Sequence, residues 1–303
     1  MKREKIIAFA VVAVVMTAGC SKDNDGERGR YRLFAEDMAA GGGAKVLVNP
    51  GNGTAQWLTG ETININNHVY TIGGNASDGY SVNTGEDALG ATLYAIYPGS
   101  SFGGNDVTVT HTGSGSGNEV VINNLVLNFH NDGKHDVVFP MSTAGITAES
   151  GTITFEHLTG GMKLTLSDIS DENDYTLGSL RIVTYGDGAT APTIEARNGV
   201  TARWAVQGPA VPGGMVGETV GDVSVMSASE MHFTLSTDGN PGKAIPHDGS
   251  ISLCVPVTIN SVKVLQVTGY NPDGVQLFSR SKTLPSAVTI ERNKMYTIPM
   301  IEL

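Results

Sequence analysis

The chain has 303 residues with 19 basic and 30 acidic side chains, which give a formal net charge of −11. A chain of this length can form one large β domain or two medium ones, and its acidic balance excludes the basic footprint that nucleic-acid binding requires. Glycine is abundant at 39 residues, whereas aromatic residues make up only 6%. This composition is typical of many short strands joined by turns.

The amino terminus has the pattern of a secretory signal: a basic start (residues 1–5), an apolar run (Ile6–Met16) and small residues before Cys20. As a helix the apolar run would rise only about 16 Å, too short for a hydrocarbon core of about 30 Å. We therefore predict that residues 1–19 are removed. A cysteine directly after Ala-Gly resembles the bacterial lipobox, which implies that Cys20 is acylated and attaches the protein to the outer membrane.

Residues 20–30 are polar and are predicted to form a tether. The tether begins with the acidic stretch Ser21–Asp25, which resembles the surface-export signal of lipoproteins in Bacteroidetes-type bacteria. A solvated acidic linker is the alternative for this stretch. Because acylation uses Cys20, only Cys254 remains and no intrachain disulfide is expected.

From Tyr31 onward the dominant hydrophobic period is two, which predicts strands with one buried and one solvated face. A first strand is expected at Tyr31–Glu36, and the alternation recurs at 62–66, 107–110, 125–129, 152–158, 162–166, 223–225, 231–235 and 251–259. Asp-Gly pairs between these runs favour hairpin turns. The best candidate for a short helix is Asp87–Tyr94. We predict an all-β fold with two β-sandwich domains at 31–150 and 151–303.

Five motifs follow one another in a recognisable order behind the lipobox. They are Trp57–Glu61, Tyr94–Pro98, Phe139–Met141, Gly151–Leu158 and Arg292–Ile298. Together they resemble the fimbrillin-like lipoproteins of Bacteroidales, which are related to major and minor fimbrial subunits. The resemblance implies two transthyretin-like Greek-key sandwiches, a surface-exposed location at the outer membrane and a structural role in a pilus that supports adhesion.

The resemblance also implies how such subunits assemble. A protease that cuts after arginine removes an N-terminal strand, and a strand from the next subunit fills the vacated groove by β-augmentation. Here Arg32 lies inside the first expected strand, and Lys45 is the only basic residue between that strand and the next. Both are candidate processing sites, and an uncut accessory or anchor subunit remains the alternative. The implied partners are other fimbrial subunits and a host or bacterial surface receptor.

The last expected strand alternates Tyr296, Ile298 and Met300, but Pro299 interrupts its hydrogen-bond donors. Proline in a strand indicates a sheet edge or a bulge. This edge either closes a sheet within the monomer or meets a partner.

Two histidines, His130 and His135, flank an Asp-Gly turn beside Asp136. They could ligate a metal, but the turn favours a hairpin with polar decoration. No coherent set of nucleophile, base and orienting group occurs in the sequence. We therefore expect neither a catalytic site nor a cofactor.

A different class of function stays open, namely a surface glycan-binding lipoprotein that does not polymerise. Four aromatic residues could stack on sugars in such a protein: Trp57, Tyr97, Tyr185 and Trp204. Scattered aromatics in a sandwich are more often part of the core or its rim, so these residues allow both interpretations.

Overall fold

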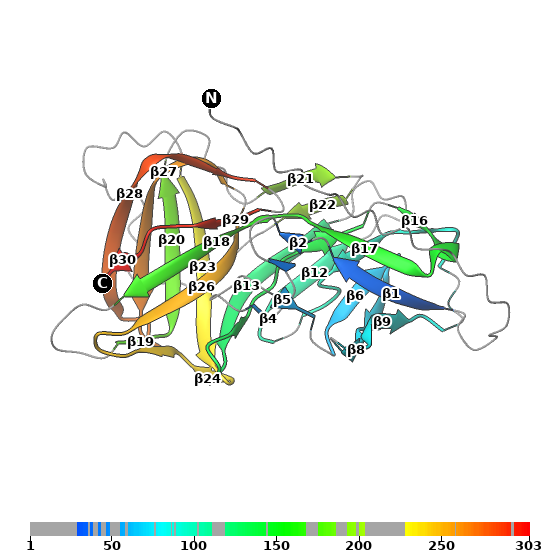
Figure 1. Ribbon diagram of the computed structural model, residues 1–303, viewed down its shortest axis with the longest axis horizontal. Helices are drawn as coiled ribbons and strands as arrows, with labels where there is room; N and C mark the ends of the chain where they lie inside the picture. Colours follow the sequence, from blue (N-terminus) through cyan, green and yellow to red (C-terminus); the bar gives the residue numbers. More distant parts are fainter. Residues whose placement is uncertain are drawn as a thin grey trace, which may run out of the picture.

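The computed structural model describes these residues: 29–35, 37–38, 42–43, 47–48, 55–57, 60–75, 77–85, 87, 89–101, 103–110, 119–143, 145–167, 175–185, 193–197, 200–203, 228–257, 259–291 and 294–303. Within them every regular element is a β-strand except one 3-10 turn, η1 (Ala148–Ser150). The strands form sheets that pack face to face (Figure 1). The predicted all-β fold built from β-sandwich layers is confirmed.

One sheet has eight strands and lies at the end of the molecule that contains β1, β8 and β9 (Figure 1). In spatial order its strands are β7 (His68–Thr71), β6 (Thr62–Ile65), β11 (Ala95–Tyr97), β15 (Met141–Ser142), β17 (Thr152–His157), β1 (Arg30–Ala35), β9 (Gly79–Asn83) and β8 (Gly73–Asn75). The first strand of the described residues, β1, is therefore an interior strand of this sheet.

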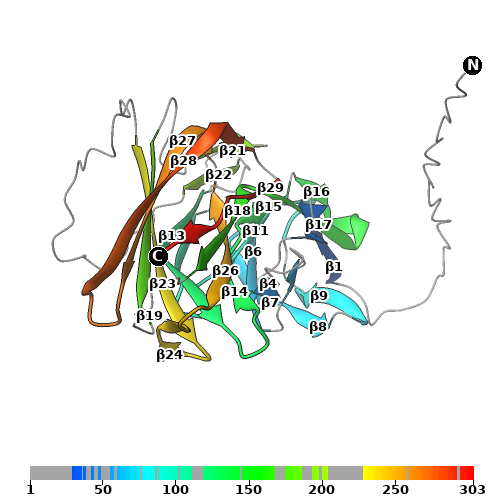
Figure 2. The same cartoon turned by 60° about the vertical axis from the view of Figure 1, so that its left-hand side comes forward.

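The largest sheet has twelve strands. Its main path is β28 (Gln276–Ile290), β27 (Ile259–Tyr270), β20 (Ser179–Tyr185), β23 (Ala228–Thr237), β13 (Glu119–Phe129), β14 (His135–Asp136), β4 (Leu47–Val48) and β5 (Ala55–Gln56). Four further strands pair beside this path: β12 (Asp106–Thr110), β21 (Thr193–Arg197), β22 (Val200–Arg203) and β24 (Asn240–Pro241). Figure 2 shows the long β27–β28 hairpin on the side of the molecule opposite β8 and β9.

A four-stranded sheet crosses in front of β20 and β23 (Figure 1). It contains β26 (Ser250–Val257), β18 (Gly160–Ser167), β29 (Met295–Thr297) and β30 (Ile301–Glu302). Three two-stranded pairs complete the fold: β2 (Asp37–Met38) with β3 (Gly42–Gly43), β10 (Thr92–Leu93) with β16 (Ile146–Thr147), and β19 (Tyr175–Leu177) with β25 (Lys243–Ile245).

The core follows from the alternation of the strands. On β18 the side chains of Met162, Leu164 and Leu166 are buried, while the residues between them are half-buried. Phe233 and Leu235 of β23 are buried in the same apolar cluster. Burial of such side chains removes apolar area from water at about 25 cal/mol per Å², so this period-two pattern supplies the main stabilising contribution.

Three parallel strand pairs in the described residues cross the predicted domain boundary near residue 150. β1 pairs in parallel with β17, and β13 pairs in parallel with β23 and, at Val121, with β22. The eight-stranded and twelve-stranded sheets therefore each contain strands from both 31–150 and 151–303, while independent folding of the two segments stays a prediction.

The helix expected at Asp87–Tyr94 does not form in the described part of that segment. Leu89 and Leu93 are both buried, and their separation of four residues matches the spacing of one helical face. Gly90, however, has φ of +84°, a left-handed conformation that ends any helix, and the following residues form β10.

Two turn and edge predictions are confirmed. Asp238 and Gly239 both have positive φ, +48° and +80°, in the turn from β23 to β24, as an Asp-Gly hairpin requires. Pro299 lies between β29 and β30, which both run parallel to β18 at the edge of the four-stranded sheet.

No helix in the described residues is long and apolar enough to cross a membrane.

Candidate functional site: the first strand and the hollow beside it

β1 is the element on which the predicted assembly mechanism depends. Its side chains alternate strictly: Tyr31 and Leu33 are buried, whereas Arg30, Arg32 and Phe34 are exposed. The sequence dictates this pattern because successive side chains of a strand point to opposite faces. One face of β1 therefore fills the core and the other faces solvent.

Both edges of β1 are paired. It runs antiparallel to β9, where Tyr31 lies opposite Val82, and parallel to β17, where Leu33 lies beside Ile153. All four of these side chains belong to the main apolar cluster. Removal of β1 would therefore leave an apolar slot between two strands, each with an unpaired row of backbone groups.

The start of β1 is fastened to the end of β9. Thr84 donates both its backbone N–H (2.7 Å) and its hydroxyl (3.0 Å) to the carbonyl of Gly29. Gly29 has φ of +82°, and a Cβ there would lie 2.3 Å from the carbonyl oxygen of Gly85, so only glycine fits. Further along, the N–H of Arg32 donates to the carbonyl of Gly151 (3.0 Å).

Of the predicted modification and processing sites, Cys20 and Lys45 lie outside the described residues. Arg32 lies in the middle of β1, with the Arg32–Leu33 peptide inside both ladders. A protease cleft accepts an extended chain whose backbone groups are free to pair. The strand must therefore leave the sheet before this bond can be cut, and processing at either residue stays a prediction.

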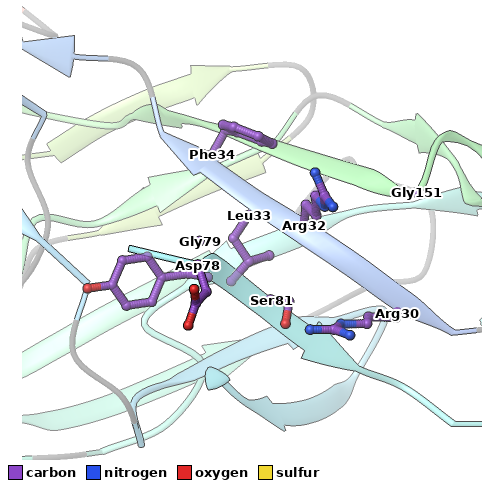
Figure 3. Close-up of a pocket in the computed structure, with 9 residues that line it drawn as sticks. Arg30, Arg32, Leu33, Phe34, Asp78, Gly79, Ser81 and Gly151 are labelled. Carbon is purple, nitrogen blue, oxygen red and sulfur yellow. The ribbon is translucent and has the colours of Figure 1, made fainter. Parts of the chain in front are cut away.

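A hollow of about 370 Å³ opens along β1. In Figure 3 the side chains of Arg32 and Phe34 lie on one side of the β1 ribbon, and those of Arg30, Asp78 and Ser81 lie on the other. The residues that line it are Arg30, Arg32, Leu33, Phe34, Asp78, Gly79, Tyr80, Ser81 and Gly151.

The lining of the hollow is positively charged in an acidic protein. Arg30 and Arg32 form no ion pair with any described residue. The one carboxylate in the lining, Asp78, accepts a hydrogen bond from the Asn75 side chain at 2.8 Å. The hollow therefore offers two guanidinium groups, the best side chains for binding a carboxylate.

The two histidines that could have shared a metal have different partners. The predicted hairpin is confirmed, since β13 pairs with β14 around them. His130 contacts Asp136 through Nε2 (3.0 Å) and Asp238 through Nδ1 (3.3 Å). Partial burial lowers the pKa of His130, but the hydrogen bonds and charges of the two aspartates outweigh it and raise the pKa overall.

His135 is buried and accepts a hydrogen bond from the backbone N–H of Cys254 at its Nε2 (2.9 Å). Burial lowers the pKa of His135 to about 4 and raises the pKa of the Cys254 thiol to about 12. At neutral pH both groups are therefore uncharged. In the described part of the chain, no group of three or more His, Cys, Asp or Glu side chains is placed to hold a metal ion.

Three of the four aromatic residues considered for sugar stacking are core residues. Trp57 is 1% exposed and makes edge-to-face contacts with Tyr97 and Phe155, at ring-centroid distances of 4.8 and 5.7 Å. Tyr185 is buried and donates to the Gln266 side chain at 3.0 Å. Trp204 lies outside the described residues. A sugar site built on Trp57, Tyr97 and Tyr185 is therefore wrong, because stacking requires an accessible ring face.

The exposed face of β1, which carries Arg32 and Phe34, was not predicted from the sequence as a binding surface. Phe34 is 52% exposed, although it follows a buried leucine. The alternation of Tyr31–Glu36 carried the signal, because it places Phe34 on the same face as Arg32. The contributions of Asp78 and Ser81 depend on strand pairing between distant residues and leave no local signal.

The chain matches no model of a known protein family, and it matches no curated protein. Several solved structures are similar to it. A candidate cell adhesion protein from Bacteroides ovatus is 13% identical with a TM-score of 0.39, and the match covers 90% of this chain and 91% of that one. A candidate cell adhesion protein from Bacteroides fragilis is 11% identical with a TM-score of 0.40, covering 90% and 92%.

A fimbrial protein from Bacteroides ovatus is also similar, at 11% identity and a TM-score of 0.29, with 91% of this chain and 50% of that chain covered. All three TM-scores are 0.40 or lower. Similarities at this level assign neither a family nor a function to the chain.

Proposed function

We propose that the protein is a structural subunit of a bacterial surface fimbria that supports adhesion. It is delivered to the outer membrane as a lipoprotein acylated on Cys20. It assembles when β1 leaves its sheet and a strand from another subunit takes its place. The proposal includes no catalytic step and no cofactor.

The observation that carries the proposal is the position of β1. It is a short strand at the start of the described chain, yet it occupies the interior of an eight-stranded sheet. Interior strands contribute both ladders and core side chains, so the vacated slot has a strong affinity for any strand of similar pattern. The exchange requires only that the chain between β1 and β4 be cut or that β1 peel away.

The test uses the full chain with Cys20→Ser, so that the protein stays out of the membrane, and with a specific protease site inserted at residues 39–41. After cutting, a labelled peptide of residues 29–36 is added. We expect the cut protein to take up the peptide and to form end-to-end polymers without it, as measured by size-exclusion chromatography and electron microscopy. A cut protein that excludes the peptide and stays monomeric contradicts the exchange.

A matched control locks β1 in place. Arg30 lies directly opposite Asn83 on β9, and opposed antiparallel residues have Cα atoms about 4.5–5.5 Å apart, within disulfide range. The pair Arg30→Cys and Asn83→Cys in the cut protein should block peptide uptake when oxidised and restore it when reduced. Uptake that is unchanged by oxidation would mean that the peptide binds elsewhere.

Lipid anchoring is tested separately in a bacterial host. The unaltered chain should incorporate radiolabelled palmitate and fractionate with the outer membrane, whereas Cys20→Ala should do neither. Equal membrane retention of both proteins contradicts acylation at Cys20.

A further inference from the structure

The outer face of β1 has a chemistry that strand exchange does not use. Exchange depends on the buried face, Tyr31 and Leu33, and on the backbone. The exposed face carries Arg30, Arg32 and Phe34 beside the 370 Å³ hollow. A pair of guanidinium groups without described ion-pair partners and an exposed aromatic ring are together unusual on a surface whose net charge is negative.

We propose that this hollow binds an acidic sugar, with its carboxylate held by Arg32 and its apolar ring face against Phe34 on the same side of β1, while Arg30 adds positive charge on the other side. Charge complementarity favours an anion, because guanidinium binds carboxylate through paired, charge-assisted hydrogen bonds. Arg30 and Arg32 are two residues apart on β1, with about 7 Å between their Cα atoms, and both line the hollow, so a ligand of one or two sugar rings can span the distance between them. Asp78 and Ser81 supply an acceptor and a hydroxyl for sugar hydroxyl groups.

The size of the hollow fits this ligand class. Small-molecule sites span about 300–1,000 Å³, and this one lies near the lower end, which suits one or two sugar rings. The side chain of Phe34 is 52% exposed, so its ring is open to contact. By contrast, the aromatic residues in the core cannot reach a ligand.

An acidic peptide is the competing occupant, and the pairing of β1 argues against it. Extended peptides bind proteins mainly by adding a strand to a free sheet edge. Both edges of β1 are already paired, with β9 and β17. A peptide over this hollow could not pair its backbone with β1 and would bind through side chains alone. A sugar binds through its ring face and its hydroxyl groups and needs no free sheet edge.

Binding at this site is coupled to the position of β1. Arg30, Arg32 and Phe34 come from β1, whereas Asp78, Gly79 and Ser81 come from β9 and the turn before it. A ligand that contacts both groups binds only when β1 is in its sheet, so it must stabilise that arrangement. The ligand should therefore slow hydrogen exchange of the β1 amides.

The experiment titrates the full chain with Cys20→Ser by isothermal calorimetry and by NMR shift mapping. The probe is digalacturonate, and the matched neutral probe is the same disaccharide with hydroxymethyl groups in place of carboxylates. We expect digalacturonate to bind, with shifts centred on β1 and β9, and to bind more weakly as salt rises. The neutral sugar should bind at least about tenfold more weakly, since it lacks the charge-assisted hydrogen bonds.

Variants separate this site from a general anion effect. Arg32→Gln should weaken binding about tenfold or more, and Phe34→Ala should weaken it several-fold. The controls are Arg280→Gln, an exposed arginine on β28, and Val275→Ala, an exposed apolar residue before it; both should leave the affinity within about twofold. Because all four positions are exposed, unfolding curves should show each variant to be folded.

Several results would overturn the proposal. These are the absence of digalacturonate binding at millimolar concentration, equal binding of the neutral sugar, equal or tighter binding of a tri-aspartate peptide, and unchanged affinity in Arg32→Gln. None of them bears on strand exchange, because the oxidised Arg30→Cys and Asn83→Cys lock tests that separately.

Discussion

The two longest parallel strand pairs that join the early and late parts of the described chain are β13 with β23 and β1 with β17, and they differ in how firmly they are held. β13 lies beside β23 over Leu125–Phe129, and β1 lies beside β17 over Arg32–Ala35. β13 has 11 residues and pairs with β14 as well, whereas β1 has six residues. Both pairs contribute to the same apolar cluster, so core burial alone does not distinguish them.

Side-chain hydrogen bonds do distinguish them. Asn128 of β13 accepts from the Ser236 hydroxyl (2.9 Å) and the Gly239 N–H (3.1 Å) on the β23 side, and Asn131 donates to Asp238 (2.7 Å). Among the described residues, no side chain of β1 hydrogen-bonds to another side chain. The comparison shows that backbone pairing and two buried side chains hold β1 in its sheet. Another strand with the same alternation can supply both kinds of contact.

The prediction with the largest expected effect tests the β13–β23 pair. Phe233→Ala removes a fully buried ring opposite Leu125 and should reduce the free energy of unfolding by about 3–5 kcal/mol. The loss should appear as one cooperative transition in urea, followed by circular dichroism. The matched control is Phe34→Ala, an exposed ring, which should change stability by less than about 0.5 kcal/mol. Equal effects of the two substitutions would remove the basis of the comparison.

The second prediction concerns His135, a buried residue of β14 that packs against Phe129 at a ring-centroid distance of 5.2 Å. Its pKa is about 4 in the folded protein against 6.5 ordinarily, so the unfolded chain binds the proton more readily. The contribution to stability is present above pH 6.5 and is lost as pH falls from there toward 4. The loss should amount to about 3 kcal/mol.

The measurement is the free energy of unfolding in urea at several pH values between 7 and 4. His135→Gln should be less stable at neutral pH because packing is lost, but its stability should fall less steeply with acidification. Other buried acids titrate in both proteins, so the difference between the two slopes is the quantity that counts. Parallel slopes would show that His135 is not the acid-sensitive group.

The third prediction tests the β1–β17 pair. Leu33→Ala truncates a side chain that is 5% exposed and should cost about 2–3 kcal/mol. Because β1 is fastened weakly, the effect should appear first as local opening. Native-state hydrogen exchange should accelerate in β1, β9 and β17 while β13 and β23 keep their protection. Val69→Ala, an exposed position on β7, is the control, and uniform acceleration in all strands would contradict local opening.

Much of this fold could be predicted from local sequence, for a definite physical reason. The alternation of Tyr31 and Leu33 with arginines, and of Met162, Leu164 and Leu166 on β18, is a property of neighbouring residues. The Asp238-Gly239 turn and the break at Pro299 follow equally from local backbone restrictions.

Pairing between distant strands could not be predicted in the same way. Nothing near Arg32 indicates that its strand lies beside Thr152, and nothing near Trp57 indicates that Tyr97 and Phe155 surround it. The helix expected at Asp87–Tyr94 failed for a related reason, because Leu89 and Leu93 are buried by strand packing rather than by a helical face. The hollow beside β1 likewise exists only after β1 and β9 have met.

The prediction with the smallest expected effect concerns the contacts between the turns that follow β13 and β23. His130 bridges Asp136 and Asp238 across the turns that follow β13 and β23, and Asp132, Lys134 and His135 are the other titratable groups nearby. Since its pKa is raised in the folded protein, its stabilising contribution is complete below the ordinary value of about 6.5 and is lost as pH rises through the raised value. His130→Gln should therefore cost less than about 1 kcal/mol at pH 5.5, because the ion pair is partly exposed, and the cost should shrink at pH 9. Asp238→Asn is the matched control, since it removes one charge but keeps a side chain of the same shape. A cost that is equal at both pH values would mean that hydrogen bonding by the neutral ring, rather than charge, fastens these two turns.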